Sequence, residues 1–95
     1  MAAEQTAKST LFIENERVRV TEWRFAPGTA TGHHRHALDY VVVPMLTGTL
    51  TIRDMRGDTP NRIVAGAPYF RNAGAEHNVI NETGGEVAFI EIELK

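Results

Sequence analysis

The chain contains no cysteine, which excludes disulfide bridges and thiolate metal ligands and is typical of a cytoplasmic protein. It also lacks a long apolar run. The longest one covers residues 40–46, with Pro44 inside it, and is far shorter than the ~20 residues of a membrane helix. Residues 1–10 lack the apolar stretch of a signal peptide. We therefore expect a soluble, cytoplasmic protein with no membrane partner.

An excess of basic residues is missing as well. The chain has 10 Lys and Arg against 12 Asp and Glu, a net charge of −2, so no basic patch for nucleic acid is expected. Its 95 residues favour one domain, which we place at residues 11–95, preceded by an N-terminal arm at residues 1–10. Because a domain this small leaves much apolar surface exposed, we expect a homodimer formed through barrel edge strands.

What the sequence does have is an alternation of apolar and polar residues with a period of two. In residues 48–53, GTLTIR, Leu50 and Ile52 are expected to point inward. Residues 87–94, VAFIEIEL, also alternate, with Val87, Phe89, Glu91 and Glu93 on one face and the remaining residues on the other. Residues 17–25 are strand-like with a shift of apolar phase, which predicts a bulge or a strand buried on both faces. Turn signals recur about every ten residues, the spacing of a small all-β sandwich or barrel.

Three of the four histidines lie in one short segment, GHHRH, at residues 32–36. On a strand, His34 and His36 share one face, and His33 and Arg35 share the other. Residues two apart are about 6.6 Å apart along a strand. Two imidazoles that lean together can therefore reach one ion about 2.0–2.1 Å from each ring nitrogen. By itself this pattern is more often that of a solvated loop.

A second segment favours the metal-binding interpretation. In GAPYFRNAGAEHNVIN, residues 66–81, His77 opens a strand after a turn and Asn81 follows four residues later. A third neutral imidazole from another strand would complete a facial triad with positions left open for water or substrate. Glu76 is expected to point away from this group, because it precedes His77 on the strand.

The two segments together resemble the two motifs of the cupin superfamily. In the first, five residues separate Gly28 from the H-R-H of residues 34–36, and Gly48 closes the motif. In the second, Gly66, Gly74, His77 and Asn81 have the family's spacing, with Asn72 in place of a proline. The run H-R-H…D-Y-V-V-V-P at residues 34–44 is similar to that of small single-domain cupins assigned to β-alanine degradation. The resemblance implies a double-stranded β-helix, a jelly-roll-like barrel, over residues 11–95.

A second departure from the family matters more, because the glutamate that many cupins use as a fourth ligand is missing. Counting forward from His36 places this position at Tyr40, and counting back from Gly48 places it at Val41. Asp39 is the nearest carboxylate, but an aspartate at a turn more often bonds backbone. We therefore favour a site of three histidines, His34, His36 and His77, with no carboxylate.

For a three-histidine site, the resemblance implies iron(II), as in the oxygen-using cupins. The ligand chemistry leaves zinc, nickel and manganese open, since imidazole binds several of these ions. Three neutral ligands leave the ion its full charge, which suits a Lewis acid that attracts an anionic, chelating substrate.

Other side chains are candidates for the pocket. Tyr40 could bond a metal-bound water or a substrate oxygen, and Arg71 could anchor a carboxylate with its planar fork. Asn81 is expected to bond backbone. Five large side chains could either line a pocket or fill the core: Trp23, Phe25, Met45, Phe70 and Phe89.

These observations leave more than one function open. The first hypothesis is metal-dependent, dioxygenase-like chemistry on a small organic acid or dicarbonyl-like compound, with Tyr40 and Arg71 as catalytic candidates. The second is a non-catalytic module that binds or senses a small molecule. It is favoured by the lack of an obvious general acid or base in the motif segments. A metal-free isomerase is third, because three converging protonated histidines would repel one another.

Overall fold

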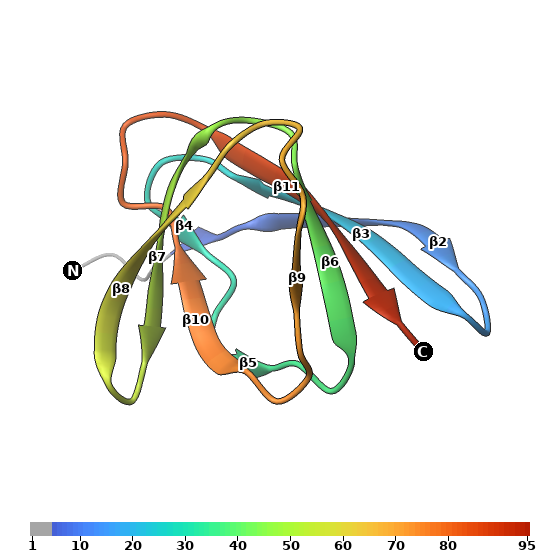
Figure 1. Ribbon diagram of the computed structural model, residues 1–95. Helices are drawn as coiled ribbons and strands as arrows, with labels where there is room; N and C mark the ends of the chain where they lie inside the picture. Colours follow the sequence, from blue (N-terminus) through green and yellow to red (C-terminus); the bar gives the residue numbers. More distant parts are fainter. Residues whose placement is uncertain (1–4) are drawn as a thin grey trace.

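The computed structural model describes residues 5–95 and consists of eleven strands with no helix in that range (Figure 1). One sheet has the order β1-β4-β10-β7-β8, with β5 paired to β10 off this path. Its strands are β1 (Gln5–Thr6), β4 (Thr29–Ala30), β5 (His34–Arg35), β7 (Gly48–Asp54), β8 (Gly57–Ile63) and β10 (Glu76–Ile80). The other has the order β2-β3-β11-β6-β9. Its strands are β2 (Lys8–Glu14), β3 (Val18–Phe25), β6 (Asp39–Pro44), β9 (Tyr69–Arg71) and β11 (Val87–Leu94). The predicted all-β class is confirmed.

The core lies between the two sheets. Phe25 and Val87 from one sheet and Leu50 and Ile63 from the other are essentially inaccessible to solvent. Each such side chain contributes roughly 1.5–3 kcal/mol when it leaves water. Leu50 is buried and Ile52 packs against the same cluster, so the inward face predicted for residues 48–53 is confirmed.

A glycine lets the two sheets approach closely at one corner. A Cβ atom on Gly48 would lie 2.6 Å from Cγ2 of Val87, closer than real Cβ contacts allow. The motif glycine at this position is therefore required by packing between β7 and β11.

The N-terminal segment takes part in both sheets. β1 runs parallel to β4, and β2 pairs with β3, so residues 5–6 and 8–10 of the expected arm are in strands; residues 1–4 lie outside the described residues. The register of β2 against β3 shifts between Leu11 and Ile13, opposite Val20 and Thr21. The irregularity predicted near residues 17–25 thus has its extra residue, Phe12, on the neighbouring strand.

The hairpin of β2 and β3 extends away from the rest of the barrel (Figure 1). On β2, which is the edge strand of its sheet, Leu11, Phe12 and Ile13 are all about half exposed. Within residues 5–95 there is no helix of the length and apolarity that crossing a bilayer demands.

Candidate metal centre

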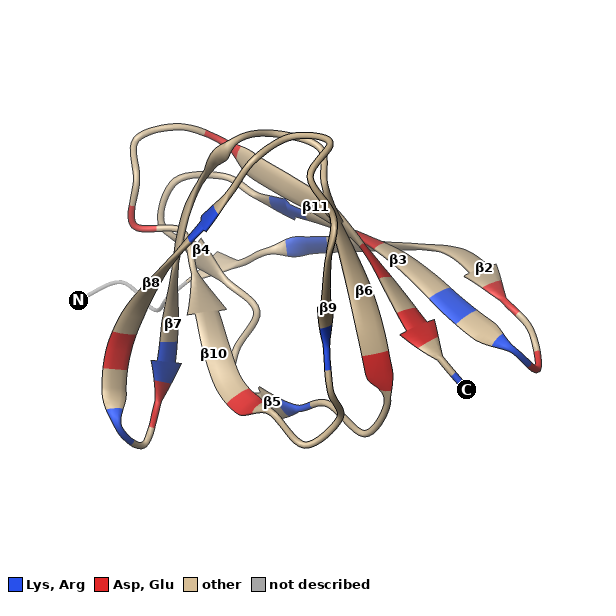
Figure 2. Cartoon of the chain, in the orientation of Figure 1, with Lys and Arg blue, Asp and Glu red and all other residues tan. Residues whose placement is uncertain are grey.

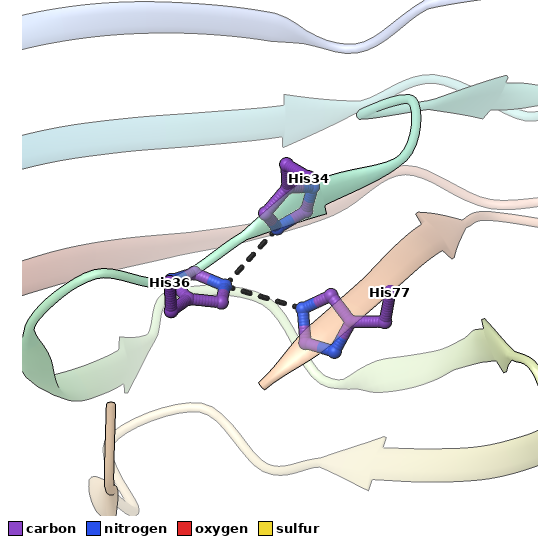
Figure 3. A group of neighbouring side chains, drawn as sticks. All are labelled: His34, His36 and His77. Carbon is purple, nitrogen blue, oxygen red and sulfur yellow. Dashed lines mark hydrogen bonds between the residues drawn. The ribbon is translucent and has the colours of Figure 1, made fainter. Parts of the chain in front are cut away.

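Backbone pairing places two of the histidines directly opposite each other on neighbouring strands. β5 and β10 are antiparallel, and His34 is the direct register partner of His77. Side chains of directly opposed residues point to the same face of a sheet, with Cβ atoms about 4.5–5.5 Å apart. Figure 3 shows the two rings on neighbouring strands, both turned toward His36.

His36 lies just beyond β5 and is held by the turn that precedes His77. Its backbone N–H donates to the Ala75 carbonyl at 2.8 Å, and its carbonyl accepts from the Gly74 N–H at 2.7 Å. Gly74 has a φ of 105°, a conformation that favours glycine. These two bonds join the two histidine segments, so the ring of His36 is brought to the same centre as the other two.

The three imidazoles converge through their Nε2 atoms (Figure 3). The distance from His36 Nε2 is 3.0 Å to His34 Nε2 and 3.2 Å to His77 Nε2. For an ion about 2.0–2.1 Å from each nitrogen, facial octahedral coordination requires nitrogens roughly 2.9 Å apart, and tetrahedral coordination roughly 3.4 Å. These two distances lie within this range, and all three ligand atoms lie within 4.8 Å of one another, so the group could hold a metal ion.

The tautomer of one ring is fixed by the backbone. His34 Nδ1 lies 2.9 Å from the carbonyl of Gly32, which only accepts, so Nδ1 carries the proton. Its Nε2 then presents a lone pair to the centre. A backbone carbonyl in this role is the usual orienting partner of a metal-binding histidine.

Burial keeps the other two rings neutral. It lowers the pKa of His36 to about 4, assisted by repulsion from His34 and His77. Burial also lowers the pKa of His77 to about 4, with His34 as the next cause. Neutral imidazole is the form that binds metals, so both rings are in the ligand state at neutral pH.

Tyr40 lies against the histidine group. Its ring stacks on that of His36 with centroids 4.1 Å apart, and it is 4% exposed. Burial, with the nearby Glu91 carboxyl, raises the pKa of Tyr40 to about 12, so its hydroxyl keeps its proton. Arg71 is the register partner of Tyr40 on β9 and is exposed at the rim. Its guanidinium lies over the Tyr69 ring, 4.5 Å from the centroid.

The other polar residues of the two motifs are engaged elsewhere. His33 is exposed and its Nε2 lies 3.0 Å from a Glu76 oxygen, on the outer side of the pair of strands. Asp39 accepts a hydrogen bond from the Ala73 N–H at 2.7 Å, as expected for a turn aspartate. Asn81 is fully buried, and its amide donates to the carbonyls of Phe25 and Gly85, which confirms the backbone role. In the part of the chain that the structure describes, the histidine group includes no carboxylate.

The group opens onto a cavity of about 580 Å³ between the sheets. His34, His36, His77, Tyr40 and Arg71 all line it. Among the five large side chains considered for the pocket or core, Trp23 and Phe89 line the cavity and Phe25 is in the core. Phe70 and Met45 do neither: they are 49% and 40% exposed, on the outside of the molecule. The sequence around Phe70 and Met45 did not show whether these side chains would point outward or inward.

Two cavity residues were not expected from the sequence. Glu91 and Glu93, on β11, line the cavity together with Phe89 of the same strand. The two-residue alternation correctly predicts that these three residues share one face of the strand. However, both faces of residues 87–94 carry apolar side chains. The apolar pattern therefore does not say which face is inward.

The chain matches no protein-family model. It is 53% identical, over the whole length of both chains, to the beta-alanine degradation protein BauB of Pseudomonas aeruginosa. It is also similar to a crystal structure of a cupin domain from Bordetella pertussis, with a TM-score of 0.96, 49% identity, and coverage of 100% of this chain and 99% of that one. A cupin superfamily protein from Desulfitobacterium hafniense, 21% identical, has the same fold with a TM-score of 0.70 over 99% of this chain and 82% of that one.

Proposed function

Because the chain belongs to the cupin superfamily, in one family with the BauB protein, we propose that it uses a divalent metal ion to transform a small organic acid or dicarbonyl-like compound. The ligands in this proposal are His34, His36 and His77, and the metal is iron(II) with oxygen as co-substrate. Zinc, nickel and manganese are the competing ions, and imidazole ligands suit zinc and nickel as well as they suit iron.

The observation that carries the proposal is the convergence of three Nε2 atoms at 3.0 and 3.2 Å. A hydrogen bond between two ring nitrogens needs a proton on one of them, and one proton at His36 Nε2 serves one neighbour at a time. A single cation satisfies all three lone pairs at once. When bound, a divalent ion there supplies a Lewis acid of undiminished charge, because its three ligands are neutral.

The chain's own residues would orient the substrate. Arg71 is exposed at the rim of the cavity and offers a carboxylate its N–H fork. The protonated hydroxyl of Tyr40, next to His36, can donate to a substrate oxygen. Trp23 and Phe89 add apolar side chains to the wall of the cavity.

The name of the BauB protein supports a small substrate, since β-alanine is a three-carbon acid. A non-catalytic binding module is the competing function. The lack of an acid or base in the motif segments favoured it, but Glu91 and Glu93 supply carboxyl groups to the same cavity from outside those segments.

Metal content is the first test. Untagged protein is purified and its metals are measured by mass spectrometry, together with variants H34A, H77A and H33A. We expect close to one ion per chain in the parent and in H33A, whose histidine lies outside the group, and a loss of metal in the other two. Equal metal in all four proteins would refute the assignment.

Oxygen uptake is the second test. The iron(II)-loaded protein is given a panel of short acids and diketones, and oxygen consumption and product are followed. Turnover that H77A lacks and H33A retains supports the enzyme. Ligand binding without turnover across the panel would favour the binding module.

A further inference from the structure

The inner face of the five-stranded sheet is arranged in rows across the strands. In the row level with the histidines, Glu93 is the partner of Tyr40, and Tyr40 of Arg71. In the next row, Glu91 is the partner of Val42, and Val42 of Tyr69. Antiparallel strands rise about 3.4 Å per residue, so Glu91 lies about 7 Å along the sheet from the row of Tyr40. Figure 2 shows the acidic positions on β11, toward its C-terminal end.

Glu91 is a buried carboxyl group without a partner in the described part of the chain. It is 9% exposed and lines the cavity. No hydrogen bond or ion pair to its carboxyl is formed within residues 5–95, and its oxygens are not sealed inside the protein. A carboxylate taken out of water without a partner is costly, so buried ones are normally paired. The partner that is missing from the protein is expected to come from what the cavity binds.

Among the charged and titratable groups that the structure describes around Glu91, none supplies the positive charge that would neutralise its carboxylate. Glu93 on the same strand repels a second negative charge, and burial with Glu93 raises the pKa of Glu91 to about 7. Tyr40 on β6 and Tyr69 on β9 face it with neutral hydroxyl groups. Arg71, the cation of the neighbouring row, is exposed, lies over the Tyr69 ring and donates to the Phe70 carbonyl at 3.1 Å.

Aromatic rings complete the surroundings. Trp23 and Phe89 are register partners in the row beyond Glu91, and Tyr69 is in its own row. The faces of such rings attract cations, most strongly where water is excluded. A buried carboxyl group beside three aromatic rings is the combination that recognises a protonated amine.

We propose that Glu91 binds the protonated amine of a ligand whose acidic end reaches the three-histidine group. This proposal rests on the proposed function for the acidic end alone. The distance of about 7 Å along the sheet between the row of Glu91 and the row of Tyr40 suits a short, unbranched ω-amino acid, whose two charged ends can reach both rows. The same acid without its amine has no group to bind Glu91.

The test compares matched ligands by calorimetry at pH 7.5 on the metal-loaded protein. The probes are 3-aminopropanoate, 4-aminobutanoate and 5-aminopentanoate, each against propanoate, butanoate or pentanoate of the same length. We expect at least one amino acid to bind about tenfold more tightly than its partner without the amine. In E91Q this preference should fall to less than about twofold, while the simple acid binds as before.

The control variant is E86Q, whose carboxylate is exposed and paired with Arg24 outside the cavity. It should keep the parent's preference, and E91D, which keeps the charge, should keep part of it. The melting temperature of each variant confirms that it folds. Equal affinity for both ligands of every pair, no binding of any amino acid, or an E91Q variant with the parent's preference would overturn the proposal.

The simple acids test the proposed function separately. Their binding should disappear when the metal is removed with a chelator or in H77A. If they bind equally well without metal, the metal proposal fails while a preference that depends on Glu91 can still be present. If they need the metal but no amine preference exists, only the role of Glu91 fails.

Discussion

His34 and His77 are direct register partners in the antiparallel pair of β5 and β10, although 43 positions separate them in the sequence. The pairing fixes both rings on one face, and the His36–Gly74 backbone bond brings in the third. The centre is therefore built by the backbone, and its geometry does not depend on long, flexible side chains.

Metal should stabilise the fold, because an ion held by β5 and β10 binds the folded chain in preference to the unfolded one. At a hundredfold excess over the dissociation constant we expect about 2.7 kcal/mol, a rise in melting temperature on the order of 10 °C. Differential scanning fluorimetry with and without zinc measures it. H33A should show the same rise and H77A almost none; a rise in H77A equal to the parent's would contradict the site.

The motif spacing predicted these three histidines because the cupin motifs fix which residues face the barrel interior. The motif spacing alone did not decide whether Tyr40 or Val41 occupies the position of the missing glutamate. Burial resolves it: Tyr40 is the inward residue, stacked on His36, and Val41 is on the other face of β6. Glu91 could not be predicted, because its face of β11 is distinguished from the opposite face only by the packing of the second sheet.

Replacing Tyr40 by phenylalanine should separate positioning from metal binding. The ring that stacks on His36 remains, so metal content should stay at the parent's level. The hydroxyl of this cavity-lining residue is lost, and we expect turnover, or ligand affinity if the protein only binds, to fall about tenfold. Metal analysis and oxygen uptake on Y40F measure the two effects. Unchanged turnover with unchanged metal would show that the hydroxyl has no role.

Gly48→Ala should destabilise the protein by about 1–3 kcal/mol, because the new Cβ would lie 2.6 Å from Val87 Cγ2. Urea unfolding measures the loss. Gly84→Ala is the matched control, since a Cβ there meets nothing within 4 Å and the change should be small. In a V87A background the penalty of G48A should shrink, as a double-mutant cycle would detect. An undiminished penalty would mean that the strain has another source.

The pKa of Glu91 predicts how stability depends on pH. Burial raises this pKa to about 7 from its usual value of 4.5, so the folded state holds a proton that the unfolded state has released over this interval. The contribution of Glu91 to stability should therefore fall, by up to roughly 3 kcal/mol, as the pH rises from about 4.5 to 7. Urea unfolding of the parent and E91Q across this range isolates the effect, since E91Q lacks the group. Parallel pH curves for the two proteins would contradict the raised pKa.

The expected homodimer should form through β2. Within residues 5–95 no strand pairs with the outer side of this edge strand, and Leu11, Phe12 and Ile13 present three apolar side chains to solvent at 57%, 54% and 49% exposure. A second copy can pair with it by two-fold symmetry, which closes both edges at once.

Sedimentation velocity over a range of concentrations should give twice the chain mass for the parent and a marked shift toward monomer for F12S. Met55 is 99% exposed at the β7–β8 turn, so M55S is the control and should remain dimeric. Because Phe12 makes up the extra residue of the bulge and is exposed in the single chain, F12S should fold with a nearly unchanged melting temperature when measured as a monomer. A monomeric parent, or an F12S variant as dimeric as the parent, would mean that β2 is not the interface.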